Sequence, residues 1–132
     1  MSVRLLIITH GNIGQSLFDT AVSILGGSPL PTEIFSIALN CEPDSTLEQI
    51  RTTLSDTEQS DGVLVLTDLY GATPSNIACE LANKNINVVA GLNLPMLIRV
   101  LNYPALSLSE LTEKAISGGQ DGVVPCHCGK KS

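Results

Sequence analysis

The chain has 132 residues, of which 43% are hydrophobic and 15% are charged, and its formal net charge is −6. This length accommodates one domain with a substantial core, and the composition excludes a disordered chain. The acidic balance and the scattered Lys and Arg residues argue against a nucleic-acid partner, and no segment approaches the ~20 apolar residues that span a bilayer.

The first predicted strand is the apolar run 3–9, which ends directly before His10. A helix follows Asn12, with apolar residues at helical spacing, and Gly26-Gly27 ends it. Residues 32–39 then predict a second strand that is only partly buried.

The middle of the chain repeats this alternation. Ser45 and Glu48 form a capping-box pattern that predicts the start of a second helix. Residues 62–67 are a continuous apolar run, typical of a strand covered on both faces. Thr73 is expected to cap a third helix, with Pro74 in its first turn.

The last third adds a strand at 88–91 and a helix that Asn93 opens. A second capping box, Ser107 with Glu110, predicts a final helix that ends at Gly118-Gly119. The short segment 122–124 (Gly-Val-Val) can add one more strand.

Strands separated by helices imply right-handed crossovers. The predicted fold is therefore α/β, a single doubly wound sheet of four mostly parallel strands flanked by helices. The sequence contains no linker, repeat or low-complexity tract. We expect one domain over residues 1–125, followed by a flexible tail at 126–132.

His10 and Asp68 are the candidate catalytic pair. Each follows an apolar strand and opens a loop, and in a parallel sheet such loops meet at the carboxyl edge, where ligands bind. A carboxylate beside an imidazole fixes the tautomer and leaves the other ring nitrogen as a nucleophile. An Asp after a strand is also a common turn former, so the pair matters more than either residue alone.

Small residues provide the candidate anion cradle. The loop Gly71-Ala72-Thr73-Pro74 presents backbone N–H groups and one hydroxyl at a helix start, and the turn at Gly11 adds further N–H groups. Beside His10 these groups predict a phosphoryl-binding site, although a capped helix start with Pro is also common for folding reasons alone.

Several alternatives lack their motifs. The chain has no P-loop sequence, no dinucleotide glycine fingerprint and no acidic pair after the first strand, so no cofactor is expected. The tail Cys126-His127-Cys128 has no second ligand pair elsewhere, and we interpret its thiols as incidental rather than as a metal site. The four cysteines have no framework spacing and the chain has no signal peptide, which predicts reduced thiols and a cytoplasmic location.

Three sequence blocks resemble the IIA component of the mannose-type family of the phosphoenolpyruvate-dependent sugar phosphotransferase system. They are residues 7–11 (Ile-Ile-Thr-His-Gly), 66–76 (Leu-Thr-Asp-Leu-Tyr-Gly-Ala-Thr-Pro-Ser-Asn) and 89–97 (Val-Ala-Gly-Leu-Asn-Leu-Pro-Met-Leu). The resemblance covers nearly the whole chain. Thr73 stands where relatives have Ser, and Tyr70 where some have Trp.

The resemblance implies that the histidine phosphocarrier protein phosphorylates His10, which passes the group to a IIB component in sugar uptake. It also implies that Asp68 orients the ring, that the Thr73 hydroxyl helps to hold the phosphoryl group, and that the protein is a homodimer whose C-terminal strand pairs with the partner's sheet. Three alternatives remain open: a regulatory carrier without sugar transport, the phosphoryl-donor subunit of a dihydroxyacetone kinase, and a non-catalytic module that binds an anion or a metal.

Overall fold

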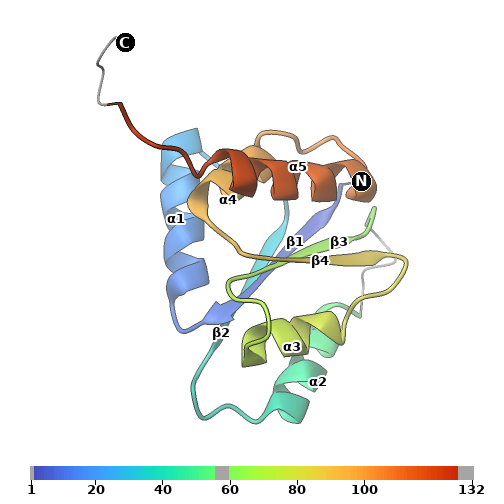
Figure 1. Cartoon of the computed structure of the whole chain (residues 1–132). Coiled ribbons are helices and arrows are strands. Elements are labelled where there is room, and N and C mark those ends of the chain that lie inside the picture. The colour runs from blue at the N-terminus through green and yellow to red at the C-terminus, as the bar shows by residue number, and fades with distance from the viewer. Residues whose placement is uncertain (1, 56–59, 128–132) are drawn as a thin grey trace.

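The structure is a computed structural model that describes residues 2–55 and 60–127. Strands and helices alternate from the N-terminus and two helices close the chain (Figure 1). The elements are β1 (Arg4–His10), α1 (Ile13–Leu25), β2 (Thr32–Ile37), α2 (Pro43–Thr53), β3 (Val63–Thr67), α3 (Thr73–Cys79), β4 (Ile86–Ala90), α4 (Leu94–Leu101) and α5 (Leu108–Asp121).

The four strands form one sheet in the order β2-β1-β3-β4, and every pair is parallel. The predicted α/β fold with a single doubly wound sheet is thus confirmed. β1 and β3 are neighbours in the centre, with Ile8 opposite Thr67. Their carboxyl ends therefore lie side by side at one edge of the sheet.

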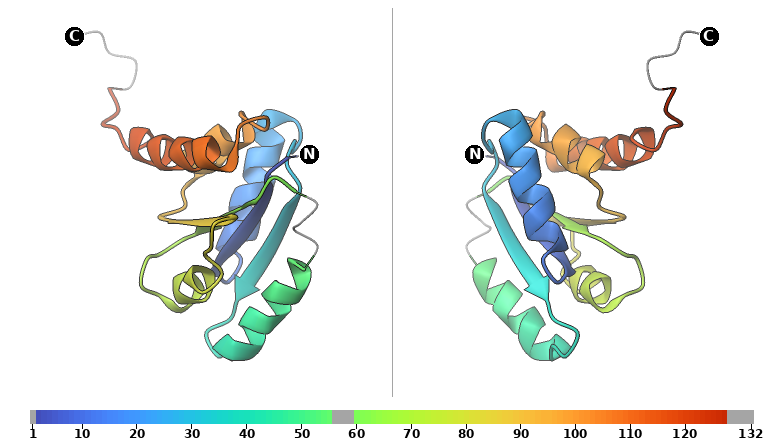
Figure 2. Two further views of the ribbon diagram at one scale, coloured as in Figure 1. Left: turned by 90° about the vertical axis from the view of Figure 1, so that its right-hand side faces the viewer. Right: turned by 90° about the vertical axis from the view of Figure 1, so that its left-hand side faces the viewer.

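Helices cover both faces of the sheet (Figures 1 and 2). Helices α1, α4 and α5 lie on one face, and α2 and α3 lie on the other. Side chains alternate along β1, so Leu5 and Ile7 join the core under the first group while Leu6 and Ile8 join the core under the second. The two faces are almost wholly aliphatic, which explains the continuous apolar runs of the central strands.

Glycine allows two close helix contacts. A Cβ on Gly14 would lie 2.7 Å from Cγ2 of Ile7, so α1 can approach β1 only because this residue has none. Gly118 and Gly119 were expected to end the last helix, but α5 continues to Asp121 and both glycines are buried inside it. A Cβ on Gly118 would lie 2.8 Å from Cβ of Arg99 on α4, so helix packing, not termination, requires a small residue there.

Two predicted helix starts are wrong. Helix α2 begins at Pro43, and its cap is Glu42, whose side chain accepts the N–H of Asp44; Ser45 lies inside the first turn. Helix α3 begins with Thr73 itself after Ala72, and no side chain caps it. In both cases proline close to the helix start set the boundary one or more residues earlier than the polar residue suggested.

The segment after α5 leaves the body of the protein (Figure 1). Residues 122–124 are not in a strand of this single chain, and Val123 and Val124 are exposed. Exchange of this segment in a dimer therefore stays a prediction. Within the described residues, no helix combines the length and apolar character that a membrane crossing requires.

Candidate functional site

The candidate site lies at the carboxyl edge of the two central strands. His10 is the last residue of β1, and Asp68 is the first residue after β3. Because the strands are parallel and adjacent, their ends deliver these two side chains to the same place, although 58 positions separate them in the sequence.

The carboxylate of Asp68 binds His10 twice. Its Oδ2 accepts the ring Nδ1–H of His10 at 2.9 Å and the backbone N–H of the same residue at 3.1 Å. Its Oδ1 accepts the N–H of Leu69 at 3.0 Å. An ionised carboxylate only accepts hydrogen bonds, so this arrangement puts the ring proton on Nδ1.

The other ring nitrogen is left available. Nε2 of His10 has no hydrogen-bond partner among the described residues, and the side chain is 36% exposed against 11% for Asp68. Burial alone would raise the pKa of Asp68, but the hydrogen bonds from the ring and backbone of His10 outweigh it and hold that pKa below its usual value. The pair therefore combines a charged, sheltered carboxylate with a partly exposed imidazole whose second nitrogen has no hydrogen-bond partner among the described residues.

The residue before the histidine fixes the first turn. Thr9 is fully buried, and its Oγ1 accepts the N–H of Gly14 at 2.8 Å. This contact satisfies one of the four N–H groups that a helix start leaves without an internal partner. The turn that carries His10 is thus tied to helix α1, a detail that no spacing rule in the sequence predicted.

The expected backbone donors of the anion cradle all have acceptors within the protein. Gly11 donates its N–H to Ile37 O at 3.0 Å, and Ala72 donates to Leu69 O at 3.3 Å. Gly71 donates to the hydroxyl of Ser75 at 3.3 Å. A phosphoryl role for these three groups stays a prediction, and it requires the loop to exchange these contacts.

Thr73 lies in the first turn of α3, at the end of the loop that begins with Asp68. It is exposed, and its hydroxyl forms no hydrogen bond with any described residue. The N–H group of Thr73 belongs to the first turn of the helix and has no acceptor within it. The structure therefore leaves the predicted hydroxyl and the amide of Thr73 open, while the role of this residue in binding stays a prediction.

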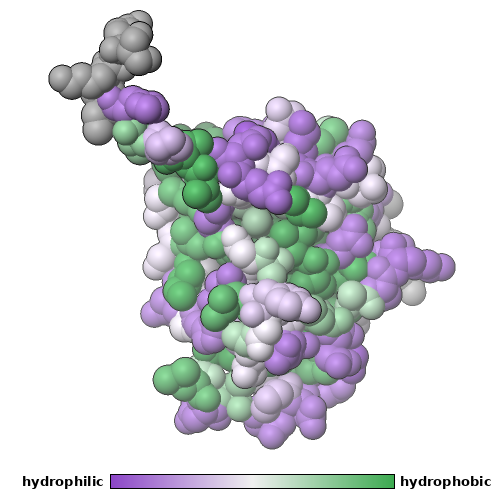
Figure 3. Space-filling model, viewed as in Figure 1, coloured by the Kyte–Doolittle hydropathy of each residue, from purple (hydrophilic) through white to green (hydrophobic). Residues whose placement is uncertain are grey.

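Apolar side chains surround this edge of the sheet. Four of them come from two loops and a helix start at this edge, and they are the exposed residues Ile13 (48%), Leu39 (100%), Leu69 (61%) and Tyr70 (80%). We call these four residues the apolar rim. Figure 3 shows hydrophobic side chains at the surface on the left of this view, the side on which β1 ends.

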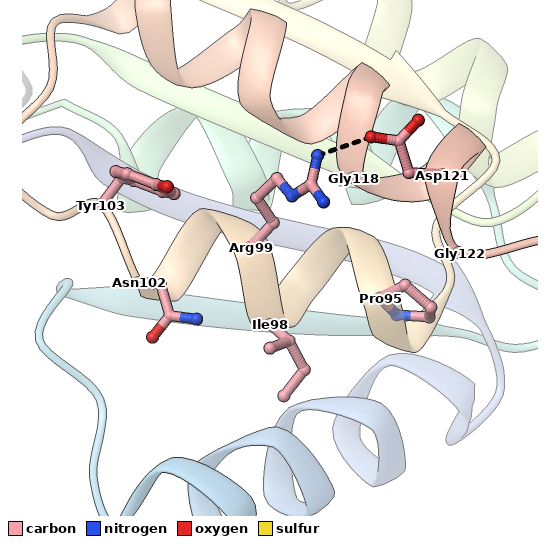
Figure 4. Close-up of a pocket in the computed structure, with 8 residues that line it drawn as sticks. All are labelled: Pro95, Ile98, Arg99, Asn102, Tyr103, Gly118, Asp121 and Gly122. Carbon is pink, nitrogen blue, oxygen red and sulfur yellow. Dashed lines mark hydrogen bonds and ion pairs between the residues drawn. The ribbon is translucent and has the colours of Figure 1, made fainter. Parts of the chain in front are cut away.

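A hollow lies away from this edge of the sheet, between α4 and α5 (Figure 4). It has a volume of about 550 Å³, and Arg99 and Asp121 face each other across it in an ion pair of 2.9 Å. Arg99 also donates to the hydroxyl of Ser117 at 3.3 Å. Its charge is thus already balanced within the protein, and none of the loops that carry His10 and Asp68 lines it.

The cysteine tail is only partly described. Cys126 and His127 are exposed, whereas Cys128 lies outside the described residues. Across residues 2–55 and 60–127, no three His, Cys, Asp or Glu side chains are grouped so that they could hold a metal ion.

The fold and the site together define an open α/β protein that presents a histidine–aspartate pair at the carboxyl edge of a parallel sheet. Residues 4–116 match the family model EIIA-man, described as the PTS system fructose IIA component. The chain therefore belongs to the mannose- and fructose-type family of IIA components of the phosphotransferase system.

Named relatives agree with this assignment. The chain is 31% identical over 128 residues to proteins named PTS system mannose-specific EIIAB component from Escherichia coli (strain K12) and Shigella flexneri. The match covers 93% of the chain but 39% of each relative, so the chain spans about two-fifths of their length.

Solved structures show the same fold over the whole chain. A mannose/sorbose-specific IIA subunit from Enterococcus faecalis is 26% identical, with a TM-score of 0.87 and complete coverage of both chains. An EIIA component from Streptococcus agalactiae is 25% identical, with a TM-score of 0.78 and coverage of 93% of this chain and 96% of that one.

Proposed function

We propose that this protein carries a phosphoryl group on His10, which it accepts from the histidine phosphocarrier protein and passes to a IIB component in sugar uptake. The observation that supports this most directly is the orientation of the imidazole. Nδ1 is bonded to a sheltered carboxylate, while Nε2 has no partner among the described residues and belongs to a partly exposed side chain. Membership of the IIA family adds the class of reaction, and the comparisons favour neither the regulatory carrier nor the kinase donor subunit.

The proposed step is an in-line exchange between two imidazoles. Nε2 of His10 attacks the phosphorus of the donor's phosphohistidine, a new N–P bond forms, and the donor's N–P bond breaks with its electron pair returning to the donor ring. The Nδ1 proton of His10 stays in place, and Asp68 stabilises the positive charge that develops on the ring. The transition state is loose, so positioning and charge stabilisation account for most of the catalysis.

Uncharged groups supply the stabilisation of the phosphoryl charge from this protein's side of the transfer complex. The loops at 10–13, 38–42 and 68–72 contain no Lys or Arg. The predicted donors are the N–H groups of Gly11, Gly71 and Ala72 together with the hydroxyl of Thr73. No metal or organic cofactor enters the proposed step.

The apolar rim supports protein partners for this site. Exposed Leu and Tyr side chains around a transfer nitrogen fit a second protein surface better than they fit a small, polar donor. We also propose a homodimer in which residues 122–124 pair with the partner's sheet. The exposed side chains of Val123 and Val124 support it, because the single chain leaves these two apolar residues uncovered.

Labelling of three proteins tests the function. The purified chain is incubated with phosphorylated carrier protein, and His10→Gln is compared with His127→Gln, which changes the other histidine of the sequence. We expect an acid-labile, base-stable phosphate on the wild type and on His127→Gln, and none on His10→Gln. Labelling that survives His10→Gln contradicts the proposal.

A further inference from the structure

One buried hydroxyl, next in sequence to Asp68, lacks a hydrogen-bond partner. Thr67 is the last residue of β3 and is fully buried, and its Oγ1 forms no hydrogen bond with any described residue. Buried hydroxyls are nearly always hydrogen-bonded, because burial without a partner is unfavourable. The corresponding residue at the end of β1 follows the rule, since Thr9 Oγ1 accepts the N–H of Gly14. The unpartnered state of Thr67 therefore needs an explanation.

A second buried hydroxyl lies on the same face of the sheet. Strand alternation places Thr67 with Val65, in the core that α2 and α3 cover. Ser75 belongs to the buried side of α3 and is 1% exposed. Its Oγ accepts the N–H of Gly71, and this is its one hydrogen bond with the described residues. Thr67 and Ser75 thus both place a buried hydroxyl at the carboxyl end of this layer. Only the hydroxyl of Ser75 has a hydrogen bond with a described residue, and its partner is Gly71.

The hydrogen bond to Ser75 occupies the N–H of Gly71, which the proposed function needs for the phosphoryl group. Gly71 is exposed and has a φ of +88°, a conformation suited to glycine, and its N–H is one of the predicted phosphoryl donors. While this N–H binds Ser75 it is not available to an anion. A serine hydroxyl can accept a second hydrogen bond, but Thr67 Oγ1 does not bond Ser75 Oγ in the arrangement that Gly71 holds. If the N–H of Gly71 turns to a phosphoryl oxygen, the buried hydroxyl of Ser75 loses its partner and its side chain is free to turn toward Thr67.

We propose that Thr67 is a positioning residue which replaces Gly71 as the partner of Ser75 when His10 is phosphorylated. Before transfer, Gly71 N–H donates to Ser75 Oγ and the Thr67 hydroxyl is unpartnered. After transfer, Gly71 N–H donates to the phosphoryl group and the Thr67 hydroxyl donates to Ser75 Oγ. No buried hydroxyl is then left unpartnered in the phosphorylated state, so the exchange favours that state. This inference rests on the proposed phosphoryl transfer to His10.

Thr67→Val tests the exchange, because valine keeps the branched shape and removes the hydroxyl. We expect the Tm of the unphosphorylated protein to rise, since an unsatisfied group is removed. We expect the equilibrium constant for phosphoryl transfer from the carrier protein to fall by about 2- to 10-fold, the worth of one ordinary hydrogen bond. Thr112→Val is the matched control, because its hydroxyl binds Asn87 and Leu108 away from the site.

Ser75→Ala completes the design as a double-mutant cycle. Without the Ser75 hydroxyl, Thr67 has no partner to gain, so Thr67→Val should not change the transfer equilibrium further in that background. The Gly71 amide proton should also change its chemical shift on phosphorylation of the wild type.

The outcomes separate this inference from the function on which it rests. A Thr67→Val protein with a higher Tm and an unchanged transfer equilibrium overturns the exchange alone. The same holds for an effect of Thr67→Val that is equal with and without Ser75. A wild-type protein that accepts no phosphoryl group overturns the proposed function and the exchange together.

Discussion

Replacement of Asp68 by asparagine tests how the site prepares its imidazole. The carboxylate uses both oxygens: Oδ2 accepts the ring and backbone N–H of His10, and Oδ1 accepts the N–H of Leu69. Asparagine has one oxygen and one NH₂ group, so it cannot accept on both sides. If its oxygen faces His10, its NH₂ group meets the N–H of Leu69. If it is turned over, its NH₂ group meets His10 and pushes the ring proton onto Nε2, the proposed nucleophile.

The size of the effect follows from the bond that is lost. A hydrogen bond to a charged group contributes about 1.5–3 kcal/mol. At about 1.4 kcal/mol per factor of ten, the rate of phosphoryl transfer to His10 should fall by roughly 10- to 150-fold. The loss should appear in the transfer step more than in the binding of the partner, because Asp68 is 11% exposed and lies behind the ring.

Rapid-quench measurement of phosphoryl transfer from the phosphorylated carrier protein provides the assay. Asp19→Asn is the matched control, since it removes the same charge from an exposed position on α1 whose partner is Gln15. The control should transfer at the wild-type rate. Transfer at that rate by a correctly folded Asp68→Asn protein would refute the role assigned to the pair.

Three further predictions follow from the same geometry. Tyr70 belongs to the exposed apolar rim, so Tyr70→Ser should raise the concentration of carrier protein needed for half-maximal labelling by several-fold. Chemical phosphorylation with phosphoramidate should be unchanged. An equal loss with both donors would mean that Tyr70 does not act through docking. Because the pKa of Asp68 is lowered on folding, its contribution to stability is fully present above about pH 4 and is lost as the pH falls through the lower folded value, so the acid-induced fall in Tm should be shallower in Asp68→Asn. Identical pH dependence of the two proteins would contradict this. Val123→Asp together with Val124→Asp should convert the proposed dimer to a monomer in sedimentation experiments, and an unchanged mass would remove these residues from the interface.

The order of strands and helices could be predicted because the hydrophobic pattern of each segment favoured one type of element. The strand at 63–67 is buried on both faces, and its continuous hydrophobicity is therefore the signature of a central parallel strand. The helix boundaries were harder to predict, because several residues competed for each one. Ser45 matched a capping pattern, yet Glu42 and Pro43 begin the helix, and Gly118-Gly119 matched a stop signal, yet close contact with α4 explains them.

The candidate site was also predictable only in part. The histidine–aspartate contact could be predicted, since both residues follow apolar strand runs whose loops were expected to meet at the carboxyl edge of the sheet. The hydrogen bonds of the loop could not be predicted. Each depends on how the loop folds in three dimensions, and this produces no periodic pattern in the sequence. The contact of Ser75 with Gly71 and the unpartnered Thr67 are of this kind, and both belong to side chains that sequence reasoning passed over.

The position of the phosphate on the imidazole tests the central claim most directly. The protein is labelled with ¹⁵N in its histidine rings, phosphorylated by the carrier protein and studied by ¹H–¹⁵N and ³¹P NMR. Since Asp68 holds Nδ1–H of His10, the phosphorus should be coupled to Nε2 of that ring, with the proton retained on Nδ1. Phosphorus bonded to Nδ1, or to any residue other than His10, would contradict the account.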